Sequence, residues 1–206
     1  GLNVTPLQIA TAYSALANGG KLIAPTFVKG QRNEGKQIID ENVAKQVVAM
    51  METVVTQGGA KQAAVLGYHV AGKTGTARKA GPGGYERGHY NALFAGVVPA
   101  TNPRFATVIV INDPQAGKYY GGLVAAPVFH NVMDGALRLM DVPPDDIQSW
   151  LVAQQAGKTG LAPSVLPMPP ADTVLPADAA AEFDAALPSA PAPAAATPPT
   201  APGGTQ

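Results

Sequence analysis

The sequence predicts a layered α+β domain of the α/β class, in which an antiparallel sheet is flanked by helices. Two helical patterns open the chain, and strand-like segments then follow one another without the intervening helices that a parallel sheet requires. A five-residue turn between two of these segments fits an antiparallel hairpin. A last helical pattern follows the strands, and its apolar face can cover the sheet.

The first helix is predicted from its start and stop signals. Thr5-Pro6 fits an N-cap followed by proline at the first helical position, and Asn18-Gly19-Gly20 fits a helix end. Residues 22–28 are expected to form a short strand, followed by a turn at 33–35.

A second helix is predicted to begin near Asp40 and to end at Gly58-Gly59. Apolar residues recur at helical spacing along it, which indicates one buried face. That face is expected to consist of Val43, Val47, Met51 and Val54.

The middle of the chain predicts three strands. Residues 68–78 have no helical period and carry β-branched residues, so they are expected to form a strand, and the polar, glycine-rich residues 79–89 a loop. Residues 90–98 predict the next strand, before the turn at 99–103. Residues 104–112, "RFATVIVIN", are apolar on both faces, which predicts a buried central strand.

A final helix is predicted over residues 126–140. Its start is placed just before Pro127, because proline is tolerated only in the first turn of a helix. Apolar side chains recur along this segment at helical spacing. Its buried face is expected to consist of Val128, Val132 and Leu139, with Phe129, Met133 and Ala136 beside them.

Composition divides the 206 residues into three parts. Residues 1–142 carry the predicted elements, and residues 143–162 are expected to form a short helical or irregular extension. Residues 163–206 contain 11 Pro and 13 Ala. Such a stretch has few large apolar groups and many helix-breaking prolines, so a disordered tail is expected.

Charge and cysteine content exclude several classes of function. All fourteen Lys and Arg, but only ten of the fourteen acidic residues, lie at or before Lys158, which leaves the tail acidic. Neither part is charged strongly enough to indicate nucleic-acid binding. Without cysteine the chain has no disulfide or thiolate chemistry. The three histidines lack ligand spacing, so neither a metal nor a cofactor is expected.

The pentapeptide AGKTG occurs twice, at residues 71–75 and 156–160. The first copy also completes a P-loop pattern that starts at Gly67. A P-loop requires a helix that begins at its lysine, whereas the residues after Thr74 are β-branched or glycine-rich, so an NTPase is the weaker alternative. The second copy borders the proline-rich tail and has no strand to carry it, so no chemistry is assigned to it.

Lys73, Thr74, Gly75 and Thr76 are the candidate site residues of the first copy. An ammonium and two hydroxyls on one exposed strand suit the recognition of a carboxylate and a peptide-like amide. Gly75 would let a ligand backbone approach closely. The N–H groups of such a strand can also stabilise an oxyanion.

Longer stretches resemble one known family. "VTPLQIATAYSALANGG", "VVAMMETVV", "YHVAGKTGTARK", "FAGVVPATNPRFATVIVIND" and "GKYYGGLVAAPVFHNVMDGALRLMDVPPD" together resemble the C-terminal part of a transpeptidase domain. The family is that of the class B, division-specific (septal) penicillin-binding proteins. The resemblance covers residues 1–146 and implies a serine β-lactamase/D,D-transpeptidase-like fold, incomplete in this chain.

The resemblance implies a D,D-transpeptidase that cross-links peptidoglycan stem peptides. A serine would attack the D-Ala-D-Ala bond, an acyl-enzyme would form, and β-lactams would trap the same serine. Lys73 would act electrostatically and in proton relay, and the hydroxyls of Thr74 and Thr76 would bind the carboxylate. The Thr76 N–H would form half of the oxyanion hole.

The resemblance also implies a rim and an aromatic wall for this site. Arg78 would lie at the rim, where it could meet acidic groups of a drug. Tyr90, Tyr119 and Tyr120 match family positions that form one side of the site, and these three tyrosines are called the aromatic wall below.

The family's S-x-x-K and S-x-N motifs are absent, since none of the four serines of this chain fits either pattern. The nucleophile is therefore expected on another segment of a longer protein, and this chain alone is not expected to be acylated. A β-lactam sensor of the same fold is the alternative function. The resemblance further implies divisome membrane proteins as partners, and an inner-membrane anchor with a periplasmic catalytic domain.

Overall fold

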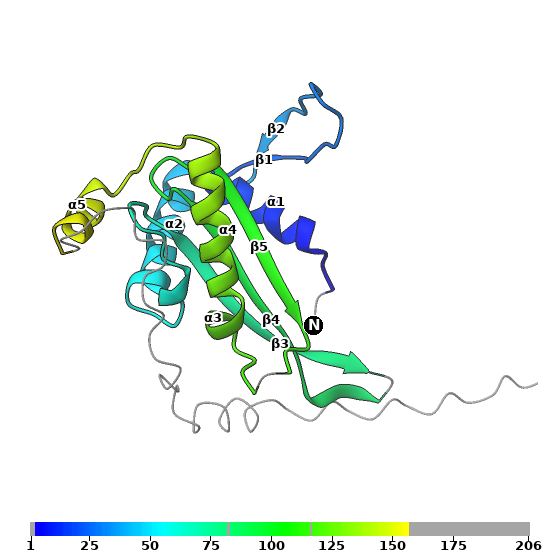
Figure 1. Cartoon of the computed structure of the whole chain (residues 1–206). Coiled ribbons are helices and arrows are strands. Elements are labelled where there is room, and N and C mark those ends of the chain that lie inside the picture. The colour runs from blue at the N-terminus through cyan, green and yellow to red at the C-terminus, as the bar shows by residue number, and fades with distance from the viewer. Residues whose placement is uncertain (1–2, 82, 116, 157–206) are drawn as a thin grey trace, which may run out of the picture. The chain divides into compact units, whose positions relative to one another are not determined.

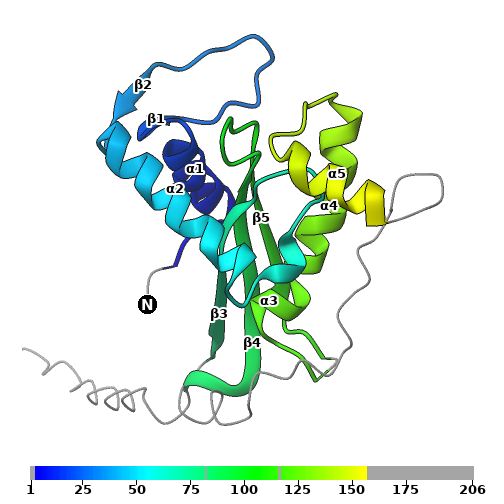
Figure 2. The same ribbon diagram turned by 90° about the vertical axis from the view of Figure 1, so that its left-hand side faces the viewer.

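The structure, a computed structural model, describes residues 3–81, 83–115 and 117–156, so the expected tail at 163–206 lies outside the described residues. A three-stranded antiparallel sheet in the order β3-β4-β5 has α1 and α2 on one side and α3 and α4 on the other (Figure 1 and Figure 2). The expected antiparallel sheet flanked by helices is confirmed. The elements are α1 (Pro6–Ala17), β1 (Lys21–Ile23), β2 (Gly35–Gln37), α2 (Glu41–Thr56), η1 (Lys61–Ala63), β3 (Ala71–Gly81), β4 (Gly84–Val98), β5 (Phe105–Asn112), α3 (Gly121–Val124), α4 (Ala126–Leu139) and α5 (Ile147–Ala156).

Side-chain caps start the first two long helices where the sequence predicts. Thr5 and Gln8 form a capping box at α1, in which the Gln8 N–H donates to Thr5 Oγ1 at 3.2 Å. The Asp40 carboxylate accepts from the N–H groups of Asn42 and Val43 at 2.9 and 3.2 Å and so caps α2.

Met51 is buried on α2 as expected, but the other buried positions of this helix lie one residue after the expected ones. Val43 is 48% exposed, whereas Ala44 is fully buried. α2 packs against β3 through Val48 and Met51, which cluster with Ala71, and alanine carries little weight in an apolar periodicity. The buried residues of α2 are Ala44, Val48, Met51 and Val55.

The first strand is much shorter than the expected 22–28. β1 pairs only with β2, with Leu22 opposite Lys36 in an antiparallel register. Pro25 follows soon after β1 and has no N–H to donate to a ladder, which explains the early end. Phe27 lies between the two strands and is 93% exposed.

The expected loop at residues 79–89 is wrong, because β3 and β4 continue through most of it as a paired arm. Gly81 pairs with Gly84 and Ala80 with Tyr85, and the register shifts between Arg78 and Ala80. Backbone pairing can form such an arm without any alternation of apolar and polar residues along its sequence. The composition was therefore misleading here.

The expected central position of residues 104–112 is also wrong. β4 is the middle strand of the described sheet, and β5 lies at its edge with mostly half-buried residues. The middle strand is where helices approach from both sides, which favours small residues such as Ala92 and Gly96 over a continuous apolar run. A Cβ at Gly96 would stand only 2.9 Å from the Phe129 ring.

The predicted buried face of α4 is correct in part. Phe129 and Met133 are buried as expected, but Val128, Val132 and Leu139 are 37, 46 and 83% exposed. The fully buried Leu137, which lies four residues after Met133, completes the face instead. The helix is thus rotated toward the side where Phe129 meets Phe94, edge to face at 4.9 Å.

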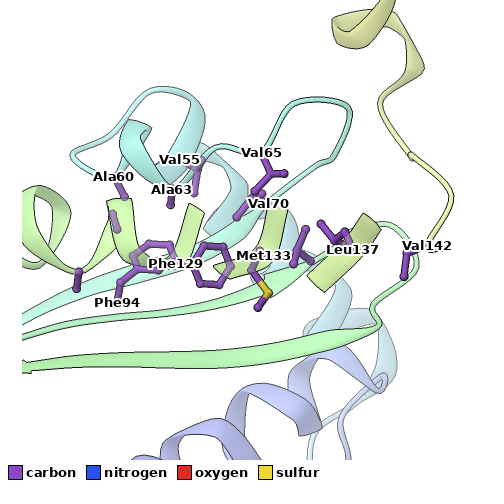
Figure 3. Close-up of a cluster of buried hydrophobic side chains, with 13 residues drawn as sticks. Val55, Ala60, Ala63, Val65, Val70, Phe94, Phe129, Met133, Leu137 and Val142 are labelled. Carbon is purple, nitrogen blue, oxygen red and sulfur yellow. The ribbon is translucent and has the colours of Figure 1, made fainter. Parts of the chain in front are cut away.

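One apolar cluster joins α4, the sheet, η1 and the end of α2 (Figure 3). Phe94 and Phe129 lie at its centre and are fully buried. Burial of two aromatic rings and the aliphatic side chains around them provides the main stabilisation of this side of the sheet. The cluster reaches Val142, just beyond α4.

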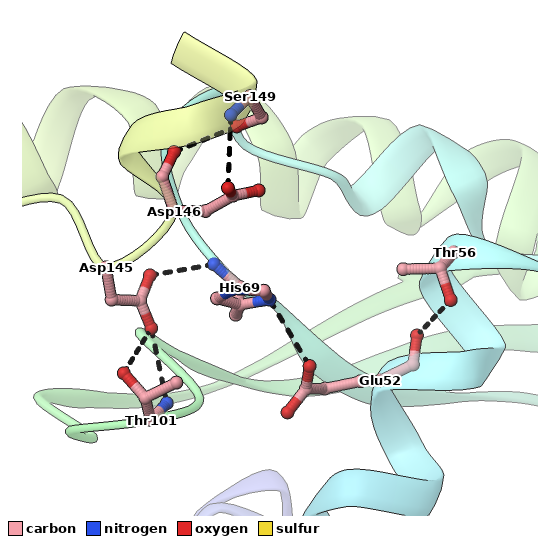
Figure 4. Close-up of polar contacts among 7 residues, drawn as sticks. All are labelled: Glu52, Thr56, His69, Thr101, Asp145, Asp146 and Ser149. Carbon is pink, nitrogen blue, oxygen red and sulfur yellow. Dashed lines mark hydrogen bonds and ion pairs between the residues drawn. The ribbon is translucent and has the colours of Figure 1, made fainter. Parts of the chain in front are cut away.

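Hydrogen bonds connect the segment after α4 to the turn between β4 and β5 and to the residues before β3. Asp145 accepts from the His69 N–H at 2.8 Å, and from the Thr101 N–H and hydroxyl at 3.2 and 2.6 Å (Figure 4). The Asp146 N–H donates to the Gly67 carbonyl at 3.0 Å. These bonds hold the residues that lead into α5. In the part of the chain that the structure describes, no helix is both long and apolar enough to cross a membrane.

Candidate active site

The candidate site residues lie on β3, an edge strand of the described sheet. Lys73 is exposed, and Thr74, Gly75 and Thr76 are half-buried. Thr74 and Thr76 face the side that carries α3, while strand alternation starts the Lys73 side chain on the opposite side. The sequence therefore places an ammonium and two hydroxyls along one open strand.

The Lys73 side chain curls over the strand toward its neighbour. Its Nζ donates to the Thr74 carbonyl at 3.1 Å and lies 3.5 Å from Thr74 Oγ1. The ammonium thus reaches the hydroxyl that strand alternation alone would put on the other face. A carboxylate bound at Thr74 would have this cation within charge-assisted hydrogen-bonding range.

The two glycines of the AGKTG copy on β3 have different reasons to be glycine. A Cβ at Gly72 would overlap the Phe94 ring and stand 2.9 Å from the Ala95 carbonyl, so packing requires glycine there. A Cβ at Gly75 would meet only Leu93, at an ordinary 3.5 Å. Packing within the described residues leaves Gly75 unexplained, which fits a position kept open for a ligand.

Thr76 connects β3 to α3. The Gly121 N–H donates to Thr76 Oγ1 at 3.3 Å, so this hydroxyl accepts from the protein and keeps its own O–H for a ligand. A Cβ at Gly121 would overlap the Leu93 carbonyl, and one at Gly122 would overlap the Gly59 carbonyl. This glycine pair therefore lets α3 lie directly against the sheet beside the candidate site.

The three tyrosines of the aromatic wall lie in one stack beside α3. The rings of Tyr90 and Tyr119 stack at 4.2 Å with 11° between their planes, and those of Tyr119 and Tyr120 stack at 4.6 Å. The Tyr119 hydroxyl donates to Tyr120 Oη at 3.5 Å, and this bond, more than burial, raises the pKa of Tyr119 above its usual value. Tyr119 is therefore a neutral phenol at physiological pH.

Arg78 is placed next to the aromatic wall by strand pairing. It lies opposite Tyr90 in the β3–β4 register, and paired residues project from the same face. Arg78 is half-buried and has an interaction partner of its own. The structure therefore brings the expected rim residue and the wall together.

An acidic group that the sequence did not single out lies at the end of the aromatic wall. Asp113 follows β5, and both of its carboxylate oxygens lie 2.9 Å from His89 Nδ1. This hydrogen bond is the main cause that lowers the pKa of the Asp113 carboxyl, and Lys79, with Nζ 3.8 Å from Oδ2, adds to it. Asp113 has a φ of 53°, a rare backbone conformation that Asp and Asn tolerate better than most residues. In the sequence, only this tolerance could have drawn attention to Asp113.

The structure excludes the P-loop alternative. Residues from Lys73 onward form a strand that runs to Gly81, whereas a P-loop needs a helix that begins at its lysine. The second AGKTG, at 156–160, lies outside the described residues apart from its first alanine.

The other histidines serve packing and local bonding. His130 Nδ1 donates to the Ala64 carbonyl, and His69 Nδ1 lies 3.4 Å from Glu52 Oε2 (Figure 4). Within residues 3–81, 83–115 and 117–156, no three His, Asp or Glu side chains gather in a way that could hold a metal ion. A cavity of about 540 Å³ lies between α1, α2 and the β4–β5 turn, and its lining does not include Lys73, Thr74 or Thr76.

An antiparallel sheet whose edge strand carries a Lys-Thr-Gly run is typical of serine acyl-transfer domains of the penicillin-binding class. Residues 1–134 match the family described as penicillin binding protein transpeptidase domain, and the chain belongs to this family. It is 46% identical over 167 residues to the peptidoglycan D,D-transpeptidase FtsI of Escherichia coli strain K12, covering 78% of this chain and 28% of that protein.

Two further proteins are similar to the chain. It is 42% identical over 149 residues to the probable peptidoglycan D,D-transpeptidase PbpC of Pseudomonas aeruginosa, covering 71% of this chain and 26% of the relative. The apo structure of the transpeptidase domain of Burkholderia pseudomallei penicillin-binding protein 3 matches with a TM-score of 0.63 and 38% identity, covering 70% of this chain and 45% of that domain. The chain thus spans little more than a quarter of the curated relatives' length.

Proposed function

We propose that the whole protein to which this chain belongs is a septal peptidoglycan D,D-transpeptidase that cross-links stem peptides and is acylated by β-lactams. The observation that supports this most is the open strand on which Lys73, Thr74 and Thr76 lie beside the aromatic wall. The names of the similar proteins favour the same activity.

Each residue of the strand has a proposed role. The Lys73 ammonium stabilises negative charge and takes part in proton relay, and the hydroxyls of Thr74 and Thr76 bind the carboxylate of D-Ala-D-Ala or of a β-lactam. Gly75 leaves room for the substrate backbone, and the Thr76 N–H polarises the carbonyl that is attacked.

The remaining groups shape the rim of the site. Arg78 would meet acidic substituents of a ligand, and the aromatic wall would take its apolar side chains. The nucleophilic serine and its lysine are proposed to come from another part of the whole protein. We also propose an inner-membrane anchor, a periplasmic catalytic domain and divisome membrane proteins as partners, on the strength of the family alone.

Covalent labelling of the whole protein with a fluorescent penicillin tests the proposal. Lys73→Ala is expected to lower the rate of labelling by about 100-fold or more, because it removes a fixed charge at the reacting group. Lys36→Ala is the matched control, since Lys36 is also an exposed strand lysine but lies on β2. A wild-type protein that takes up no label would contradict the proposal.

A second assay separates the transpeptidase from the β-lactam sensor. A transpeptidase is expected to release D-Ala from a stem peptide that ends in D-Ala-D-Ala, with repeated turnover when an acceptor amine is present. A protein that is labelled by penicillin but releases no D-Ala would be a sensor of the same fold.

A further inference from the structure

An irregular stretch of the β3–β4 arm lies next to the aromatic wall. Arg78 pairs with Tyr90, but the next paired residues are Ala80 and Tyr85. Lys79 on one strand therefore faces the stretch 86–89 on the other. Such bulges turn side chains away from the regular alternation of a strand.

The bulge directs two side chains toward the residue that follows β5. His89 Nδ1 lies 2.9 Å from both carboxylate oxygens of Asp113, and Lys79 Nζ lies 3.8 Å from one of them. The backbone of Asp113 is held as well, because its N–H donates to the Tyr90 carbonyl at 2.8 Å. Asp113 is thus fixed at both its main chain and its side chain.

This arrangement bears on the aromatic wall because Asp113 begins the segment that leads to Tyr119 and Tyr120. Tyr90 belongs to β4, while the other two tyrosines follow β5. Their stack, 4.2 Å between the rings of Tyr90 and Tyr119, forms only if the second segment leaves the sheet in the right direction. Asp113 is the first residue of that segment, and its positive φ of 53° turns the chain as it leaves the sheet.

We propose that His89 and Asp113 are positioning residues for the aromatic wall, and that they thereby favour ligands whose side chain carries an aromatic ring. This inference rests on the proposed function of the site. The pair joins β4 to the segment after β5 through a hydrogen bond between side chains. Both residues act through the placement of Tyr90 and Tyr119.

The exposure of the pair supports positioning rather than a mainly stabilising role. The side chains of His89 and Asp113 are 48 and 22% exposed, and ion pairs of this kind add little to the free energy of unfolding. The pair links β4, which carries Tyr90, to the segment that leads to Tyr119, so a contact of small energy can have a specific geometric effect.

The test compares two penicillins as acylating agents of the whole protein. Benzylpenicillin carries an aromatic acylamino side chain, and 6-aminopenicillanic acid has none. For His89→Ala, the second-order rate constant of acylation by benzylpenicillin is expected to fall about fivefold, the size of one lost aromatic contact. The constant for 6-aminopenicillanic acid is expected to change less than about twofold.

A conservative variant and a control complete the design. His89→Asn keeps an N–H donor near the position of Nδ1 and is expected to restore most of the rate with benzylpenicillin. Arg87→Ala removes an exposed cation from the same arm and is expected to have no effect on either rate. An equal loss with both penicillins, or no loss with either, would overturn the positioning role.

Asp113 provides an independent pair of variants. Asp113→Gly tolerates the positive φ but removes the carboxylate, and Asp113→Asn keeps an acceptor for His89. The glycine variant is expected to repeat the selective loss, and the asparagine variant to show less of it. If the wild-type protein reacts with neither penicillin, the proposed function fails first, and the two failures are thereby distinguished.

Discussion

Glycine shows most clearly how a single residue carries structure or function in this chain. Gly72 and Gly75 stand three positions apart in the same motif. Their contacts differ, since Gly72 lies against the Phe94 ring while Gly75 has ordinary room for a methyl group. The sequence already points to Gly75 as the position open to a ligand, but only the contacts show that packing requires glycine at position 72.

Replacing each of these glycines by alanine should separate folding from activity. Gly72→Ala is expected to lower the free energy of unfolding of the whole protein by about 1–3 kcal/mol, because the new methyl group overlaps Phe94. Gly75→Ala is expected to change it by less than about 0.5 kcal/mol but to slow acylation about tenfold. Denaturant titration and penicillin labelling measure the two effects. Comparable losses of stability in both variants would contradict the assignment.

At the scale of the element, the start of a helix can be predicted from its own sequence more reliably than the face that it buries. The starts of α1 and α2 were predicted from Thr5-Pro6 and Asp40, because a cap involves atoms within three residues of the chain. The rotation of α4 was predicted only in part, because Val128 and Val132 are as apolar as the buried residues. The face that becomes buried depends on the helix's fit to the sheet.

Two neighbouring positions on α4 test its observed rotation. Met133→Ala is expected to lower the free energy of unfolding by about 2–5 kcal/mol, because it leaves a cavity beside Phe129. Val132→Ala is expected to lower it by less than about 1 kcal/mol, because Val132 is 46% exposed. Urea titration of the whole protein measures both values. A larger effect at Val132 would favour the face expected from the sequence.

At the scale of the whole molecule, hydrogen bonds connect the segment after α4 to the rest of the fold. Composition placed the end of the folded body near Val142 and a short helical or irregular extension after it. Asp145 and Asp146, however, bond to the turn that carries Thr101 and to the residues before β3. We therefore propose that the structural boundary lies beyond these bonds, nearer to Ala156.

Two truncations of the whole protein test that boundary. Ending the chain after Ala156 is expected to leave both the thermal unfolding midpoint and penicillin labelling unchanged, because only the proline-rich segment is lost. Ending it after Val142 is expected to destabilise the protein by about 1–3 kcal/mol, since the Asp145 bonds to the half-buried His69 N–H and to Thr101 disappear. A large loss of stability in the longer variant would show that the tail is part of the folded unit.

The sequence by itself determined the local features of this protein and the family to which it belongs. It placed the helix starts, the Lys-Thr-Gly strand and the three tyrosines, because each of these depends on neighbours in the chain or on a motif. The tertiary structure decided that β4 is the middle strand, that Thr76 meets Gly121, and that His89 meets Asp113 beside the aromatic wall. The physical reason is separation along the chain. Thr76 and Gly121 are 45 residues apart, and no local pattern specifies that they will lie within hydrogen-bonding distance.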